Sequence, residues 1–334
     1  MKSKGTIQAS ATKSKSHLSP QRINEIGLAI ALVILVVVLS IRSPFFASFD
    51  NMWAILGDAA LVGIVAWPAT LIIIAGDIDL SVGPAVAFWS VILADLMVKF
   101  HFNIWISIVL TLFGGWTVGC FAGWLRGRFG VPSFIVTLGL WSSFRGAAQF
   151  MTNSLPVAIN QNGLMDFLSG KIGPMPTPAV MMFVLFFVFA FIARRTTFGR
   201  TVYAVGGNPR AAMLAGINVV KIRVLIFGLS GMLSAFLALV VAARLSSGTS
   251  SAGQGLEFSV IAAVVVGGTS LSGGRGTLLG TLLGTIFIAV IGNGLIILGV
   301  NSYFQDVLRG FLIVGAVLIN TIVSRRGSKD TKIS

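Results

Sequence analysis

The chain has 334 residues, of which 55% are hydrophobic and only 10% are charged. Because a soluble domain usually has about a quarter of its residues charged, this composition excludes a soluble globular protein and predicts an all-α integral membrane protein. The formal net charge of +14 would suggest a nucleic-acid partner in a soluble chain. In a membrane protein the positions of the charges matter more, and we expect no nucleic-acid partner.

The first 25 residues form a basic segment rich in serine and threonine. No short apolar region with a cleavage site follows them, so we expect a cytoplasmic tail rather than a removed signal peptide. The chain is then expected to divide into this tail (1–25), a transmembrane domain (26–324) and a second short tail (325–334).

Apolar runs in the central domain predict a polytopic protein with about ten transmembrane helices, each of which needs roughly 17–25 residues. Of the 24 lysines and arginines, 18 lie in segments on the same side as the N-terminus, four lie on the opposite side and two lie within spans. Positive charge collects on the cytoplasmic side, so we expect both termini in the cytoplasm. The expected spans lie near 26–41, 54–75, 82–98, 104–125, 133–150, 178–193, 222–243, 257–271, 277–299 and 304–323.

A polar stretch, GDIDLSVGP (76–84), lies where the second span ends and the third begins. Charges at membrane depth usually face a cavity or a partner and mark substrate or ion paths. Irregular backbone is tolerated there only where protein or water satisfies it. We therefore expect Asp77, Asp79 and Ser81 to lie along a translocation path or gate. Asp79 or Ser81 could instead cap the following helix.

Two more carboxylates enter apolar segments. Glu257 follows the polar stretch GQG (253–255), where it either lines the path or compensates the positive end of a helix. Asp58 lies inside the second span and needs an internal partner that the sequence does not identify. The two histidines and the single Cys120 lie in separate segments, so we expect no metal site and no catalytic constellation.

The largest cytoplasmic loop covers 194–223. In it Asn208 is a good N-cap, Pro209 suits the first helical position and Gly216 suits the C-terminal end. This pattern predicts a helix of about two turns between Asn208 and Ile217. Such a short helix could dock in a groove of another protein, or it could be an ordinary amphipathic connector.

The stretch SLSGGRG (270–276) contains a match to the signature motif of ABC ATPases. The sequence has no G-x-x-x-x-G-K-[ST] phosphate-binding loop, so this chain is not expected to hydrolyse ATP. Between two apolar spans, the glycines instead predict a tight turn with positive φ angles.

Five motifs resemble the permease subunits of bacterial carbohydrate ABC importers, in the branch of the ribose, arabinose, xylose and autoinducer-2 systems. The resemblance covers nearly the whole chain, from about 26 to 324, with the motifs in the same order. The motifs are GDIDLSVG (76–83), VPSFIVTLG (131–139), TFGRTVYAVGGNPRAAMLAGI (197–217), ARLSSG (243–248) and IAAVVVGGTSLSGG (261–274).

The resemblance implies a permease that carries a monosaccharide or related polyol across the bacterial inner membrane by alternating access. It also implies a second permease copy or paralogue, a separate ATPase that holds ATP and Mg²⁺, and a sugar-binding protein that is periplasmic or lipid-anchored. No cofactor is expected on this chain itself. The short helix would be the coupling helix that inserts into the ATPase. Its coupling residues would be Arg200, Gly206, Gly207, Asn208, Pro209, Ala211, Ala212 and Gly216.

The sequence also leaves alternatives open. Relatives often have Glu-Leu-Asp where this chain has Glu257-Phe258-Ser259, so the resemblance does not identify the sugar, and a nucleoside or a branched-chain amino acid is a second possibility. A proton-coupled secondary transporter also uses broken helices and internal repeats. In favour of such a repeat, DLSVG (79–83) echoes SLSGG (270–274).

Overall fold

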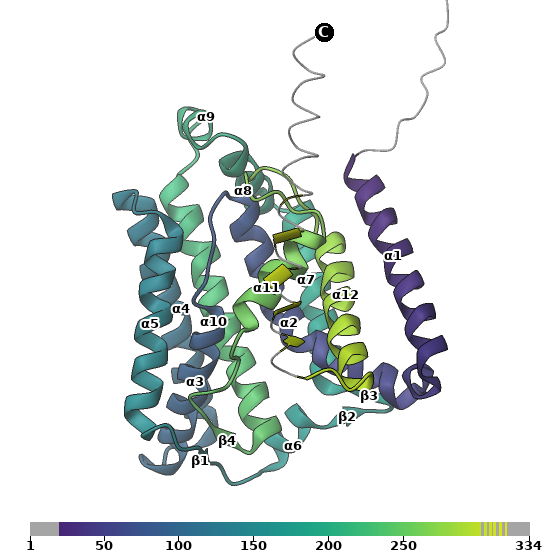
Figure 1. Ribbon diagram of the computed structural model, residues 1–334. Coiled ribbons are helices and arrows are strands. Elements are labelled where there is room, and N and C mark those ends of the chain that lie inside the picture. Colours follow the sequence, from purple (N-terminus) through teal and green to yellow (C-terminus); the bar gives the residue numbers. More distant parts are fainter. Residues whose placement is uncertain are drawn as a thin grey trace, which may run out of the picture.

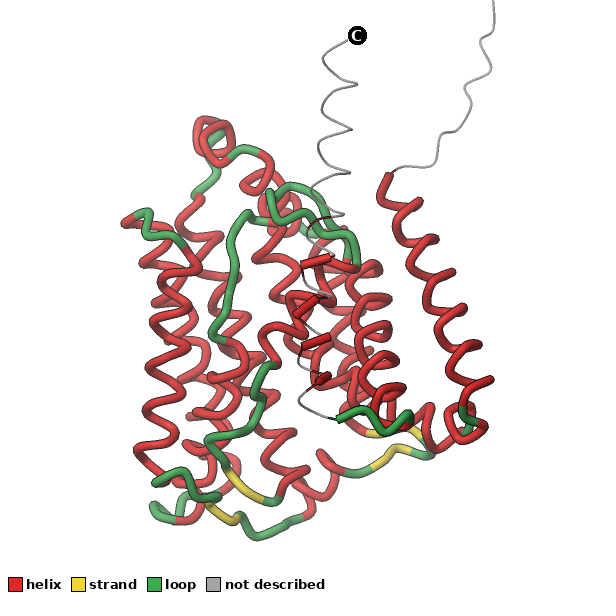
Figure 2. Tube along the Cα trace, viewed as in Figure 1, coloured by secondary structure: helices red, strands yellow, loops and turns green. Residues whose placement is uncertain are grey.

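The computed structural model describes residues 20–301 and nine individual residues between 304 and 318. Within this part of the chain the regular structure is almost entirely helical (Figure 2), which confirms the expected all-α membrane fold. The expected tenth span (304–323) lies mostly outside the described residues, as do residues 1–19 and the tail at 325–334.

Helices connected by short segments account for the described chain (Figure 1). The two strand pairs, β1 with β4 and β2 with β3, tie loops together at one end of the molecule, which we call the β4 end. The opposite end carries α8 and α9 and is called the α9 end. In chain order the elements are α1 (Pro20–Arg42), η1 (Pro44–Ala47), α2 (Phe49–Ile74), α3 (Val82–Val98), α4 (Ile104–Phe129), α5 (Ser133–Thr152), β1 (Val157–Ala158), α6 (Gly163–Ser169), β2 (Lys171–Ile172), β3 (Met175–Pro176), α7 (Thr177–Arg195), α8 (Thr197–Gly207), α9 (Pro209–Leu214), α10 (Val219–Leu245), β4 (Ser247–Gly248), α11 (Leu256–Val266) and α12 (Leu278–Ile297).

Nine of the ten expected spans correspond to a helix. Among the described residues, α1, α2, α4, α7, α10 and α12 are long and apolar enough to cross a membrane. α3 and α11 are apolar but shorter, and α5 has 20 residues but includes several polar side chains.

The eighth span was expected over 257–271, and this boundary is wrong, because α11 ends at Val266. The chain turns at Gly267 and Gly268, the second of which has a φ of +89°. At 1.5 Å per residue, the 11 residues of α11 reach about 16 Å, roughly half of the bilayer core. α11 is therefore a half-helix.

α3 and α11 enter the molecule from opposite ends (Figure 1). After α2 reaches the α9 end, residues 75–81 turn back and α3 begins in the middle. After α10 reaches the β4 end, residues 249–255 turn back and α11 begins in the middle. The first turns of the two helices meet, because Glu257 lies against Gly83 so closely that a side chain there would overlap its carboxylate.

α4 and α10 pack backbone against backbone over most of their length. Gly115, Gly119, Gly123 and Gly127 recur every four residues on α4, and each faces the α10 backbone. A Cβ at Gly119 would overlap the carbonyl oxygen of Phe227. Small residues at this spacing let membrane helices approach closely and gain packing energy, so we infer that α4 and α10 move as one rigid pair.

We predict that Gly119→Ala destabilises the protein, because its methyl group must push α10 away. Overpacking of this kind typically costs about 1–3 kcal/mol. The matched control is Gly292→Ala on α12, where an added Cβ meets no atom within 4 Å. Thermal unfolding in detergent should show a lower Tm for Gly119→Ala alone, and equal Tm values for the two variants would contradict the rigid pairing.

Candidate functional site

The connection between α2 and α3 is irregular backbone inside the protein. The amides of Ala75, Gly76 and Asp77 still donate to carbonyls at the end of α2, and α5 supplies partners for two of the amides that follow. The N–H of Ile78 donates to Ser133 Oγ at 3.0 Å, and the N–H of Leu80 donates to Thr137 Oγ1 at 3.1 Å. Irregular backbone at membrane depth needs such partners. These two bonds therefore stabilise the irregular segment at residues 75–81, which we call the break.

Asp77 is held by two arginines from different helices. Arg126 Nε of α4 donates to Oδ1 at 2.5 Å, and Arg223 Nε of α10 donates to Oδ2 at 2.9 Å. The Asp77 side chain is 0% exposed and that of Arg223 is 10% exposed. Removing one partner of a buried ion pair typically costs about 3–5 kcal/mol, so this triad fixes the start of the break.

Asp79 is satisfied at both carboxylate oxygens. Oδ1 accepts from the Ser81 N–H at 2.9 Å and from Ser81 Oγ at 2.6 Å, and Oδ2 accepts from Ser230 Oγ of α10 at 2.7 Å. Ser81 occupies the N-cap position of α3, but its side chain makes no capping bond. The capping alternative is therefore wrong for the Ser81 side chain, because its hydroxyl is committed to Asp79.

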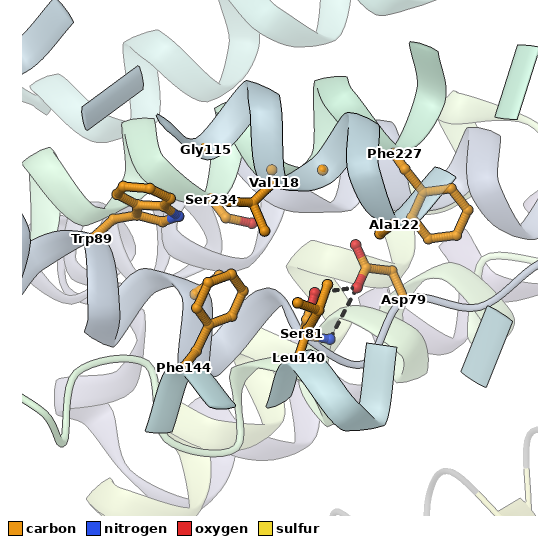
Figure 3. A pocket seen from close by; sticks show the side chains of 13 residues that line it. Asp79, Ser81, Trp89, Gly115, Val118, Ala122, Leu140, Phe144, Phe227 and Ser234 are labelled. Atoms are coloured by element: carbon orange, nitrogen blue, oxygen red, sulfur yellow. Dashed lines mark hydrogen bonds between the residues drawn. The ribbon is translucent and has the colours of Figure 1, made fainter. Parts of the chain in front are cut away.

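A small cavity lies beside Asp79 and Ser81 (Figure 3). Trp89, Phe144 and Phe227 form much of its wall. Its volume is about 10 Å³, which is about enough for one water molecule. A sugar cannot fit there, so this cavity is not a substrate site.

Glu257 lies where the first turns of α3 and α11 meet and is 3% exposed. Its Oε1 accepts from Trp141 Nε1 of α5 at 3.0 Å. Its Oε2 has no hydrogen-bond partner among the described residues and lies against Gly83. The first turns of α11 and α3 carry positive partial charge, which supports the charge-compensation alternative for this carboxylate.

Asp58 is separate from this group. Its carboxylate accepts from Arg244 Nη1 of α10 at 3.1 Å, and the two side chains are 45% and 51% exposed. Arg244 is in the last turn of α10, at the β4 end, whereas Arg223 is near its start. The partner that the sequence left open is thus Arg244, and an exposed pair of this kind contributes about 0–1 kcal/mol.

Sequence reasoning missed the partners that hold Asp77 and Asp79. Arg126 and Arg223 had been counted as cytoplasmic charges, and Ser230 had been assigned to an ordinary span. Arginines at the ends of spans, opposite two carboxylates at membrane depth, were a usable signal for a buried ion pair. Which helix supplied them could not be read from spacing.

The loop at 194–223 contains two helices, α8 and α9, of which only α9 had been expected. Asn208 ends α8 and caps α9, accepting from the N–H groups of Arg210 and Ala211 at 3.0 Å each. Gly216 follows with a φ of +83°. The cap and the glycine are as expected, but α9 is shorter than the segment from Asn208 to Ile217, since it ends at Leu214.

α9 exposes two large apolar side chains beside the exposed Arg210. Met213 is 62% exposed and Leu214 is 91% exposed, whereas Ala212 is 5% exposed and faces the rest of the chain. Ala211 and Arg200 are exposed. Beneath α9 lies a groove of about 360 Å³, whose lining includes Gly127, Arg210, Met213, Ile217, Val220 and Arg223.

α8 packs directly on the end of α2 and on the glycine turn at 270–276. A side chain at Gly206 would overlap the Ile74 carbonyl oxygen, which accepts from the Gly274 N–H at 2.8 Å. Tyr203 donates its hydroxyl proton to the Gly276 carbonyl at 2.9 Å, and burial raises the pKa of this hydroxyl, so it stays protonated. Gly273 and Gly274 have φ angles of +82° and +73°, which confirms the expected tight turn.

The comparisons with known proteins agree with this architecture. The family model described as "Branched-chain amino acid transport system / permease component" matches residues 51–317. The chain is 54% identical to the probable ABC transporter permease protein YphD of Escherichia coli K12, over 96% of each chain. It is 37% identical to the ribose import permease protein RbsC of Bacillus subtilis 168, over 89% of this chain and 92% of the relative.

A third relative is the L-arabinose ABC transporter permease protein AraH of Azospirillum brasilense, with 34% identity over 90% of this chain and 88% of the relative. No solved structure matches the chain. The chain therefore belongs to this permease family and is a multi-pass membrane subunit of an ABC importer.

Proposed function

We propose that two copies of this chain form a path for a neutral monosaccharide or a related small polyol, which crosses the bacterial inner membrane by alternating access. The relatives named for ribose and L-arabinose support this class of cargo. Membership of an ABC importer family argues against the proton-coupled secondary transporter that the sequence had left open.

The observation that carries this proposal is the outward face of α5. Gly139, Ser142, Gly146 and Gln149 recur at helical spacing and are exposed, together with the apolar Ile135 and Leu138 on the same side. Ser143 beside them is also exposed. Polar groups facing lipid are costly, and the cavity beside Asp79 is too small for a sugar. A second copy across a water-filled gap would satisfy this face, and serine and amide groups there could bind sugar hydroxyls weakly.

The α9 end is proposed to be cytoplasmic, with both termini on that side, and to receive a separate ATPase that holds ATP and Mg²⁺. Asn208, Pro209 and Gly216 shape α9, and Gly206 and Gly207 end α8 before it. Arg200 and Ala211 are exposed, whereas Ala212 is buried and positions the helix from behind. A periplasmic or lipid-anchored sugar-binding protein would meet the β4 end.

We assign different tasks to the five acidic and hydroxyl residues expected along the path. Asp77, Asp79 and Ser81 are engaged in holding the break, so their proposed role is gating rather than sugar binding. Glu257 is proposed to hold the junction of α3 and α11. Asp58 is paired at the β4 end, and we propose that it acts only at the opening of the path on that side.

The function is tested by uptake of radiolabelled D-ribose, L-arabinose and D-xylose into cells that depend on this chain. In a Cys120→Ser background, Ser142→Cys should make uptake sensitive to a membrane-impermeant, negatively charged thiol reagent. Val188→Cys on the apolar surface of α7 is the matched control and should stay insensitive. Absence of uptake for every sugar would contradict the cargo, and equal sensitivity of the two variants would contradict the α5 path.

Docking of the ATPase is tested at Leu214. Leu214→Asp places a carboxylate on the most exposed apolar side chain of α9, so an apolar contact with the ATPase should be lost. Lys221→Gln changes the net charge by the same amount on an exposed residue of the same loop. The ATPase recovered with a tagged chain should fall at least tenfold for Leu214→Asp only. Unchanged recovery would contradict docking through α9.

A further inference from the structure

Arg223 contacts both the groove beneath α9 and the buried Asp77. It lines the groove beneath α9, and its guanidinium holds the buried Asp77 at 2.9 Å. Only residues 215–218 separate α9 from the start of α10, and Asn218 caps α10 by accepting from the Lys221 N–H at 2.9 Å. Arg223 thus lies one turn along α10 from the loop that carries α9.

The backbone at Arg223 has little freedom to move independently of α4. A Cβ at Gly123 would lie 2.5 Å from the Arg223 carbonyl oxygen, and one at Gly127 would lie 3.0 Å from Val220 Cα. Arg126, the second partner of Asp77, comes from the same turn of α4. Both arginines therefore belong to the glycine-packed α4–α10 pair.

Asp77 is the point where this pair holds the break. Both of its carboxylate oxygens are committed to arginines, and the side chain is 0% exposed. The amides of Ile78 and Leu80, which follow it, donate to two hydroxyls of α5 instead of helical carbonyls. A charge-assisted contact is stronger than a neutral hydrogen bond, so a shift of the pair would displace Asp77 along with it.

We propose that Arg223, with Arg126, transmits the displacement of α9 to the break at residues 75–81 through Asp77. The two arginines are positioning residues, because they act on the path through Asp77 and contact no cargo. This inference rests on the proposed function, since it assumes that an ATPase moves α9. It goes beyond that function in naming the residues that connect the ATPase contact to the gate.

The test compares Arg223→Gln with Arg223→Lys in the complex purified through a tag on this chain and reconstituted in vesicles. The measured quantity is labelled sugar imported per ATP hydrolysed. Arg223→Gln should lower this ratio at least tenfold while the ATPase is recovered in equal amount, and Arg223→Lys, which keeps the charge, should restore most of it. The matched control is Lys99→Gln, which removes a cation from the buried Asp95 at the opposite end of α3 and should leave the ratio near that of the unmodified chain.

A second measurement does not depend on the cargo. In the Cys120→Ser, Ser142→Cys background, a nonhydrolysable ATP analogue should change the thiol reaction rate, and Arg223→Gln should abolish that change. If the change occurs without any sugar import, the cargo is wrong and the inference stands. If Arg223→Gln keeps both the ratio and the change, the inference is overturned.

Arg126→Gln provides an independent variant, because its partly exposed side chain makes a folding defect less severe. If Arg223→Gln fails to assemble, Arg126→Gln is measured in its place, and it should also lower the amount of sugar imported per ATP hydrolysed. A normal ratio for Arg126→Gln would then overturn the inference.

Discussion

A buried carboxylate held between two arginines lets this chain break a helix inside the membrane. The amides of Ile78, Leu80 and Ser81 have no helical hydrogen bond, and exposure of such groups to lipid would be prohibitive. Ser133, Thr137 and Asp79 accept from these three amides instead, and the ion pairs of Asp77 hold the segment in place. Because the break is stable, α3 can begin in the middle of the molecule and meet α11 there.

The meeting of α3 and α11 has a sequence counterpart. Residues 78–82 read IDLSV and residues 256–260 read LEFSV, so an acidic residue followed two positions later by serine lies just before α3 and in the first turn of α11. The two helices enter from opposite ends (Figure 1). Of the two segments compared in the sequence, DLSVG leads into α3, whereas SLSGG forms a glycine turn between α11 and α12.

The two acidic residues that correspond in this comparison, Asp79 and Glu257, differ in their hydrogen bonds. Asp79 has hydrogen-bond partners at both oxygens, whereas Glu257 has one partner, Trp141, and an Oε2 atom that faces the start of α3. The first arrangement anchors the break to α10. The second ties the junction to α5, the helix whose polar face we assign to the path, so movement at the junction would reach α5 directly.

Local chemistry was predictable from the sequence, and long-range pairing was not. The apolar runs located nine helices, the glycines of 270–276 gave the turn, and Asn208, Pro209 and Gly216 gave the ends of α9. The partners of Asp77 are 49 and 146 residues away, and only the fold brings them together. Hydropathy alone overextended α11, because apolar residues and glycines continue past the point where the helix ends.

The most direct test of this account is hydrogen–deuterium exchange of the intact complex, purified through this chain, with and without a nonhydrolysable ATP analogue. Amides at residues 76–82 should be protected without nucleotide and change their exchange several-fold with it, while α4 and α10 stay protected in both states. If the amides at 76–82 exchange at the same rate in both states, or if α4 and α10 lose protection together with them, the break is not a gate moved by a rigid pair.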